Sequence, residues 1–258
     1  MGRRAFALLS LFVAPLSACT LLVKSDDLVG GSAPSGGDAG STGVLDADGG
    51  RVDGGRGCEG KALCDDFEGA GTIPWKPTTT GNAAIVVDAV KPRGGAKALH
   101  ASRAPAAGRE AAYYAYNPAG TLRFCELDVF ATSSTGDPFS VFDLRFGSVE
   151  VPFISYSLSM QMGGGLAQFG ARSGSPSLYT DVHVASLAFG AWKHVRIEFD
   201  WASSSPAILL SVDGATEPRF PISPPKGTNP MVLIGMTYAA TQSEGWEVFV
   251  DNVVCTAD

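Results

Sequence analysis

The sequence lacks clustered positive charge, long apolar runs and helix-like periodicity. It has 258 residues, of which 19 are Lys or Arg and 26 are Asp or Glu, giving a net charge of -7. Nucleic-acid binding needs a basic patch that releases counterions, so the composition argues against that class of function. The early apolar stretch 5–13 is followed by Pro15 and is far shorter than the roughly 20 residues of a membrane-spanning helix.

The usual catalytic signatures are missing as well. The chain has no Gly-x-Ser-x-Gly elbow, no His-Glu-x-x-His motif, no phosphate-binding glycine loop and no Cys-x-x-Cys pair. Its histidines, His100, His183 and His194, are scattered along the sequence. These absences argue against serine hydrolase, zinc protease and nucleotide-dependent chemistry.

What the sequence does contain at its start is an export signal, with a positively charged beginning, a short apolar core and small residues. Leu16-Ser17-Ala18-Cys19 resembles the lipobox of bacterial lipoproteins, in which cleavage falls before a cysteine that carries acyl chains. An ordinary secretory site is less suitable, because Leu16 occupies the third position before the cut. The resemblance implies a signal peptide over 1–18, lipidation of Cys19 and a membrane anchor through lipid, and Thr20 favours the outer membrane of the cell envelope.

Residues 19–57 are predicted to be a disordered tether. Gly, Asp, Ser and Ala dominate this stretch, so it cannot bury enough apolar surface to offset its ordering entropy. Removing 1–18 takes away two arginines and changes the net charge from -7 to -9. We therefore expect the acyl chains, and not attraction to anionic lipid, to hold the protein on the membrane.

From residue 58 onward, apolar and polar residues alternate in short runs. In 193–201, Val195, Ile197, Phe199 and Trp201 share one face and charged residues the other. The same period recurs in 140–146, 153–162 and 207–213, and further strands are expected near 83–89, 97–102, 121–131, 166–172, 231–238 and 246–255. Period two with one apolar face is typical of antiparallel strands that cover a core on one side. The sequence predicts one all-β domain over 58–258, a two-sheet antiparallel sandwich.

Four cysteines besides Cys19 are predicted to form disulfides, because their count is even and the chain is expected to be exported. Three pairings are open in principle. We favour Cys58–Cys64, which are close in sequence, and Cys125–Cys255, which lie in two strand-like segments.

Three sequence segments carry a resemblance to a known family. Gly190-Ala191-Trp192 with Val212-Asp213-Gly214 frames a hairpin, Cys64–Gly69 precedes Trp75, and Val248–Val254 lies near the end. Together they resemble the laminin-G-like, concanavalin A-like jelly roll over about residues 60–258. Members of that family are often carbohydrate-binding modules, adhesion domains, glycoside hydrolases or polysaccharide lyases, and the fold alone does not choose among them.

Hydrolases of this fold carry Glu-x-Asp-x-x-Glu or a close variant, whose carboxylates flank the scissile bond. Glu126-Leu127-Asp128-Val129-Phe130-Ala131 has only the first two acidic residues of that pattern. Glu198 and Asp200 also share one face of a strand. We therefore expect no complete catalytic site, and Glu126, Glu198 and Asp200 are only weak catalytic candidates. The simpler interpretation is that these residues lie on strand faces exposed to solvent.

The resemblance also implies a structural calcium ion that ties the first strand to the last. Its candidate ligands are Glu68, Asp251 and a backbone carbonyl near Gly95. Calcium takes six to eight oxygen ligands, so these residues supply only part of a shell.

Aromatic rings are the expected contacts for a glycan, because sugar rings stack on half-exposed Tyr and Trp while polar neighbours bind the hydroxyl groups. Trp192 and Trp201 are expected in the core. The candidates for ligand binding are Tyr113, Tyr114, Tyr116, Tyr179 and Trp246.

The sequence thus predicts a cell-envelope lipoprotein that presents a non-catalytic jelly-roll module, with a polysaccharide or other glycan as its partner. A divergent glycoside hydrolase or polysaccharide lyase is the alternative, and a component that binds an envelope protein is the third.

Overall fold

The computed structural model describes residues 58–258 apart from residues 70–74, 106–107, 109, 133–138, 147–152, 162–163, 173–177, 185, 218, 223–229 and 240–244. The predicted signal peptide, the lipidation site Cys19 and the tether lie outside the described residues. All described strands belong to one compact unit, Leu45–Asp258. No helix long and apolar enough to cross a membrane occurs in the described part of the chain.

The described chain folds into strands connected by turns and loops. The strands are β1 (Leu63–Asp65), β2 (Lys76–Thr79), β3 (Ala83–Asp88), β4 (Ala98–Arg103), β5 (Glu110–Tyr116), β6 (Leu122–Ala131), β7 (Phe139–Phe146), β8 (Phe153–Gln161), β9 (Gly164–Arg172), β10 (Leu178–Val184), β11 (Lys193–Asp200), β12 (Ala207–Val212), β13 (Ala215–Thr216), β14 (Phe220–Pro221), β15 (Pro230–Ala239) and β16 (Trp246–Ala257).

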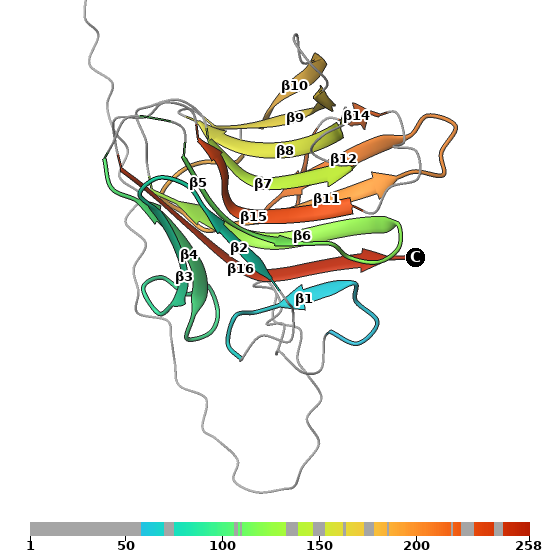
Figure 1. The fold of residues 1–258 in the computed structure, drawn as a ribbon. Coiled ribbons are helices and arrows are strands. Elements are labelled where there is room, and N and C mark those ends of the chain that lie inside the picture. Colours follow the sequence, from blue (N-terminus) through green and yellow to red (C-terminus); the bar gives the residue numbers. More distant parts are fainter. Residues whose placement is uncertain are drawn as a thin grey trace, which may run out of the picture. The chain divides into compact units, whose positions relative to one another are not determined.

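The strands form two antiparallel sheets (Figure 1). The nine-stranded sheet has the order β13-β12-β11-β6-β16-β4-β3, with β1 paired to β16 and β14 paired to β12. The seven-stranded sheet has the order β10-β9-β8-β7-β15-β5-β2. The predicted two-sheet antiparallel sandwich is confirmed.

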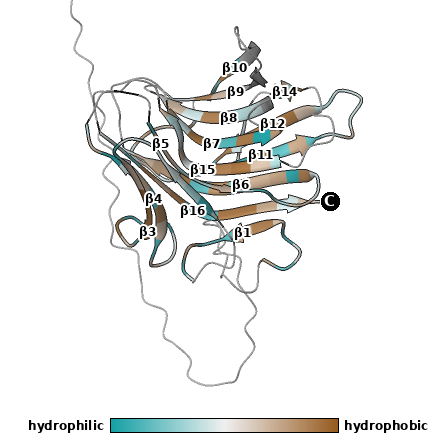
Figure 2. Ribbon diagram, in the orientation of Figure 1, coloured by the Kyte–Doolittle hydropathy of each residue, from teal (hydrophilic) through white to brown (hydrophobic). Residues whose placement is uncertain are grey.

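The core lies between the inner faces of the two sheets. Val195, Ile197 and Phe199 of the nine-stranded sheet and Leu144 and Leu158 of the seven-stranded sheet belong to one buried cluster. Figure 2 shows the strands carrying apolar residues interrupted by hydrophilic ones, as the two-residue period requires. Near one end, Arg103 of β4 and Glu110 of β5 form a buried ion pair across the core, with Nε and Oε2 2.7 Å apart.

The strands with clear alternation appear where they were predicted, but β2, β5, β10 and the two-residue strands β13 and β14 were missed. β5 reads Glu-Ala-Ala-Tyr-Tyr-Ala-Tyr, in which small and aromatic residues hide the polar and apolar alternation. β10 also escapes prediction, although it pairs with β9 over its whole length. Pairing with β15, far away in sequence, fixes β5 as a strand, whereas β10 pairs with the strand directly before it.

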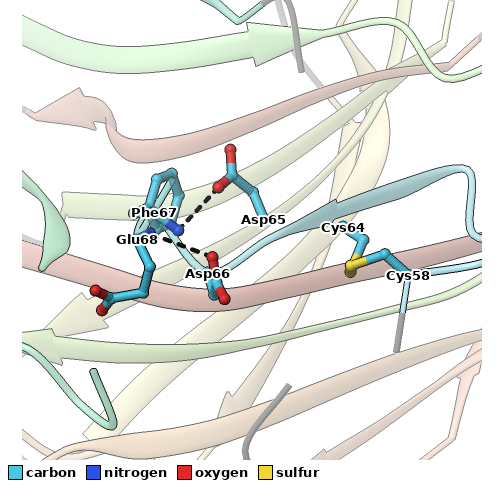
Figure 3. Close-up of a disulfide and its surroundings, with 6 residues drawn as sticks. All are labelled: Cys58, Cys64, Asp65, Asp66, Phe67 and Glu68. Atoms are coloured by element: carbon cyan, nitrogen blue, oxygen red, sulfur yellow. Dashed lines mark hydrogen bonds between the residues drawn. A yellow bond between two sulfur atoms is a disulfide. The ribbon is translucent and has the colours of Figure 1, made fainter. Parts of the chain in front are cut away.

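Both predicted disulfides are present. Cys125 lies directly opposite Cys255 in the pairing of β6 with β16, so the bond joins two central strands of the nine-stranded sheet. Cys58 pairs with Cys64 at the start of β1, where Figure 3 shows the disulfide next to the segment 65–68. The chain entering the domain is therefore fixed to its first strand.

Candidate functional site

The outer face of the seven-stranded sheet carries a patch of polar side chains that we call the serine face. In β7 and β8, Phe142, Leu144, Tyr156, Leu158 and Met160 point into the core, so the residues between them point outward. Ala167 in β9 and Val182 in β10 also point toward the core, so their neighbours Gln168 and Asp181 point outward. The serine face consists of Ser140, Asp143, Arg145, Ser155, Ser157, Ser159, Gln168 and Asp181.

Strand register aligns part of the serine face in a straight row. Asp143 lies opposite Ser157, Ser157 opposite Gln168, and Gln168 opposite Asp181. Figure 1 shows the four strands concerned, β7 to β10, running side by side. A row of this kind presents a carboxylate, a hydroxyl and an amide at intervals of about 4.8 Å.

Hydrogen bonds hold these side chains in place. Arg145 donates to Oδ2 of Asp143 from Nη2 at 2.6 Å and from Nε at 2.9 Å. Gln168 Nε2 donates to Asp181 Oδ1 at 2.9 Å, and the hydroxyls of Ser140 and Ser159 are 2.9 Å apart. These bonds fix the orientation of most members of the serine face, so that part of it is preorganised.

The centre of the serine face is sunken although it points away from the core. Asp143 is 4 % exposed and Ser157 is 8 % exposed, whereas Asp181 at the sheet edge is exposed. A solvent-facing row would expose short side chains more fully, so neighbouring groups shield the centre from water. Shielding strengthens any hydrogen bond that a ligand makes there.

The geometry of the serine face does not suit hydrolysis by two carboxylates. Its described acidic residues, Asp143 and Asp181, are separated by three strand spacings, about 14 Å along the sheet. Glycoside hydrolases place their two carboxylates about 5–10 Å apart. Sequence reasoning did not select this face, although the outward polar residues of 140–146 and 153–162 were visible in the alternation.

The predicted aromatic residues are distributed over both sides of the sheet. Tyr113 alternates outward on β5, on the same side of the sheet as the serine face but separated from β7 by β15. Tyr114 and Tyr116 point inward beside Trp75, with ring centroids 5.9 Å from that indole in each case. The side chain of Tyr179 lies outside the described residues. Trp75, which was not among the candidates, donates from Nε1 to Asp65 Oδ2 at 2.7 Å.

The prediction that Trp246 binds a ligand is wrong, because its side chain is only 1 % exposed and belongs to the core. It begins β16 and alternates inward with Val248 and Val250. A ring buried between two sheets cannot stack on a sugar from solution.

The weak catalytic candidates lie on the outer face of the other, nine-stranded sheet. Arg196 connects two of them, donating to Glu198 Oε1 at 2.6 Å and to Glu126 Oε2 at 2.8 Å, and its guanidinium stacks on the ring of Phe124. Asp200 accepts from Arg219 at 2.6 Å. Each carboxylate is thus held by an arginine. Glu198 and Asp200 also line a cavity of about 370 Å³ together with Phe124 and Arg196.

The same outer face carries a histidine–aspartate pair. His194 Nδ1 lies 3.0 Å from Asp128 Oδ1, and Asp128 Oδ2 accepts from Asn252 Nδ2 at 2.8 Å. The hydrogen bond that His194 donates to the Asp128 carboxylate raises the pKa of His194 above its ordinary value, against the opposing effect of partial burial. This cluster lies beside the residues that were predicted to bind calcium.

The three calcium candidates are brought together around the loop between β3 and β4. Glu68 Oε1 accepts from the backbone N–H groups of Ala96 and Lys97 at 2.6 and 3.0 Å, and a Cβ on Gly95 would collide with the Glu68 carboxylate. Asp251 is 1 % exposed and accepts from Arg93 N at 2.9 Å.

The opening segment that supplies Glu68 is tightly turned. Phe67 has a positive φ of 58°, and the carboxylates of Asp65 and Asp66 accept from the backbone N–H groups two residues ahead, as Figure 3 shows. Burial, and then the charges of Asp128 and Glu68, raise the pKa of Asp251 to about 6. Among the described residues, no group of three His, Cys, Asp or Glu side chains is placed to hold a metal ion.

Solved structures share this architecture. An endo-β-1,4-glucuronan lyase from Trichoderma reesei superposes with a TM-score of 0.61 at 11 % identity, covering 77 % of this chain and 96 % of its own. The cellulose-induced protein Cip1 gives 0.54 at 14 % identity, covering 76 % and 97 %. A β-glucanase of Bacillus licheniformis gives 0.50 at 12 % identity, covering 76 % and 98 %.

These likenesses show that the chain has the concanavalin A-like jelly-roll fold, and at such identities they show the fold alone. No protein-family model matches the chain, and no curated protein matches it in sequence.

Proposed function

We propose that this jelly roll is a non-catalytic glycan-binding or adhesion module and that the serine face is its binding surface. The observation that carries the proposal is the row of Asp143, Ser157 and Gln168. Asp143 and Ser157 are sunken, and hydrogen bonds orient Asp143 and Gln168. A polysaccharide presents many hydroxyl groups that both donate and accept, and this row offers both kinds of partner. Tyr113, which points outward on the same side of the sheet two strands beyond β7, adds an aromatic surface for a sugar ring.

Proteins with this architecture support the glycan class as the first one to test. The solved structures named above include a glucuronan lyase and a β-glucanase. Another comes from a study of endo-acting O-glycanases that initiate mucin breakdown, with a TM-score of 0.52 at 14 % identity.

Affinity electrophoresis of residues 45–258, in gels cast with laminarin, xylan, hydroxyethylcellulose, alginate or polyglucuronate, tests the proposal. We expect one of these polymers to retard the wild type and Gln168→Ala to reduce the retardation. Ser211→Ala is the matched control, because Ser211 lies opposite Arg196 in the other sheet. No retardation by any polymer in a broad panel would contradict glycan binding and would favour an envelope protein as the partner.

A second candidate function, cleavage of a glycan, rests on the cavity that Glu198 and Asp200 line. Release of new reducing ends or of unsaturated sugars would reveal it. Loss of that release in Glu198→Gln would support a catalytic role, and full activity of the variant would remove Glu198 from the mechanism. The arginines that hold these carboxylates favour the binding function over this one.

We propose further that a lipid on Cys19 anchors the module in the cell envelope, at the outer membrane. The lipobox-like sequence supports this proposal. Metabolic labelling with a fatty-acid analogue should mark the wild type and not Cys19→Ser. Labelling of both proteins would contradict lipidation at this position.

A structural calcium ion is the last element of the proposal. Glu68, Asp251 and a backbone carbonyl near Gly95 would hold it. The burial of Asp251 and its repulsion by the Glu68 carboxylate support such a site. The ion would neutralise negative charge beneath the β3–β4 loop. We expect calcium to raise the melting temperature relative to a chelator and Asp251→Asn to abolish that difference. Equal melting temperatures in wild type would contradict the site.

A further inference from the structure

Strand β3 ends the nine-stranded sheet with one edge open among the described residues. It pairs with β4 through six consecutive register positions, from Ala83 opposite Arg103 to Asp88 opposite Ala98. No described strand pairs with its other edge. An antiparallel edge of this kind presents backbone N–H and C=O groups that a further strand can pair with.

The exposed large apolar side chains of the described chain gather at this edge. Val86 is 48 % exposed and Val87 is 38 % exposed, and Val90, just beyond the strand, is 65 % exposed. Val86 and Val87 lie on opposite faces of β3, because successive residues of a strand alternate. A strand added to this edge would therefore cover apolar surface on both of its faces.

The other sheet ends are protected and β3 is not. β2 carries Lys76 and Pro77, a charge and a residue without an N–H group, which discourage strand addition. β10 carries Asp181 and His183, both exposed, while β13 and β14 have two residues each. Residues 83–87 contain no charge and no proline, and their pairing with β4 has no bulge.

We infer that β3 pairs antiparallel with β3 of a second copy of this chain, around a two-fold axis at Val86. An antiparallel pair of identical strands is self-complementary, as a two-fold interface requires. In this register Ala84 faces Asp88 and Ile85 faces Val87, so no like charges meet. The carboxylate of Asp88 is already bound to His100 Nδ1 at 2.7 Å within its own copy. The inference does not depend on the proposed function.

The first test is the molar mass of residues 45–258 by light scattering and sedimentation at micromolar concentrations. We expect the wild type to have twice the monomer mass. The double variant Val86→Lys, Val87→Lys should have the monomer mass and keep the far-ultraviolet circular dichroism spectrum of the folded wild type. Val90→Lys is the control and should remain a dimer. A monomeric wild type would overturn the inference, and so would a dimer that survives both lysines.

Cysteine cross-linking tests the position of the axis. In Val86→Cys the two introduced thiols meet across the axis, within the Cα separation below 7 Å that a disulfide needs. In Val90→Cys they are about 26 Å apart, from eight residues at about 3.3 Å each. We expect mild oxidation to link the first variant and not the second. Equal linking of both, or linking of the second alone, would contradict the register.

Discussion

On the nine-stranded sheet, the outward-facing carboxylates are held by cations, with Arg196 between Glu126 and Glu198 and His194 beside Asp128. On the seven-stranded sheet, most outward-facing residues of β8 are serines, and the one ion pair of β7 is sunken among them. Both faces arise from the same two-residue alternation. The difference teaches that alternation fixes which side chains face outward, while their chemistry decides whether a face is satisfied within the protein or offers hydrogen bonds to a ligand.

The largest expected effect concerns the covalent reinforcement of the nine-stranded sheet. Replacing both Cys125 and Cys255 by Ala removes a bond that closes a loop of 130 residues. In the chain-entropy model such a loop contributes about 4–5 kcal/mol to the free energy of unfolding. Urea unfolding should reveal a loss of that size, while replacing Cys58 and Cys64, which are six residues apart, should cost less. Equal losses would contradict the dependence of the stabilisation on loop length.

The next effect compares the two arginines, each of which donates two hydrogen bonds to carboxylates. Arg145→Gln leaves the carboxylate of Asp143, 6 % exposed, without its cation, so we expect a loss of about 2 kcal/mol in unfolding free energy. Arg196→Gln affects carboxylates that are 25 % and 46 % exposed, so we expect about 1 kcal/mol. Denaturant titration of both variants measures the two losses in unfolding free energy. A larger loss for Arg196→Gln than for Arg145→Gln would contradict the prediction.

A smaller effect, of opposite sign, tests the inner side of the seven-stranded sheet. The hydroxyl of Tyr156 is fully buried in the core and has no hydrogen-bond partner among the described residues, and burial raises its pKa. Tyr156→Phe should therefore stabilise the protein by about 1 kcal/mol. Tyr116→Phe is the control. Because the Tyr116 ring is partly exposed, this substitution should leave the free energy of unfolding unchanged. A destabilised Tyr156→Phe protein would show that this hydroxyl is satisfied.

The smallest expected effect is the pH dependence of the unfolding free energy that arises from His194 on the nine-stranded sheet. Because its pKa is raised in the folded protein, its stabilising contribution is complete below its ordinary pKa of about 6.5 and is lost as the pH rises through the raised value. The side chain is 42 % exposed, so the contribution should be a few tenths of a kcal/mol. The difference in stability between wild type and His194→Gln should shrink from pH 5.5 to pH 8.5. A difference that grows with pH would contradict the assignment.

Much of this fold follows from local sequence, because Val195 to Trp201 and Phe142 to Phe146 show their inward faces directly. Trp192 was expected in the core, yet it lies one position out of phase with Val195 and its ring is 5.9 Å from Phe130 on the outer side. The two-residue alternation of the strand, extended back to Trp192, indicates this outward position. For Trp246 too, the alternation with Val248 and Val250 places the ring on the inward face.

The serine face shows why the candidate site was harder to predict than the fold. Asp143, Ser157, Gln168 and Asp181 are far apart in sequence and meet only through the register of four strands. Each strand reveals its own polar side, but no single strand reveals the row. The disulfide partners of β6 and β16 were easier, because cysteines are few and each needs a partner.

The measurement that tests the central claim most directly is calorimetric titration, with the glycan that retards the wild type, of Arg145→Gln and Arg196→Gln. Each substitution removes one guanidinium and two hydrogen bonds to carboxylates, so the two differ in the face they alter. We predict that Arg145→Gln weakens binding at least tenfold, about 1.4 kcal/mol, while Arg196→Gln binds as the wild type does. Wild-type affinity in Arg145→Gln together with weakened binding in Arg196→Gln would contradict the serine face as the binding surface and would place it on the nine-stranded sheet.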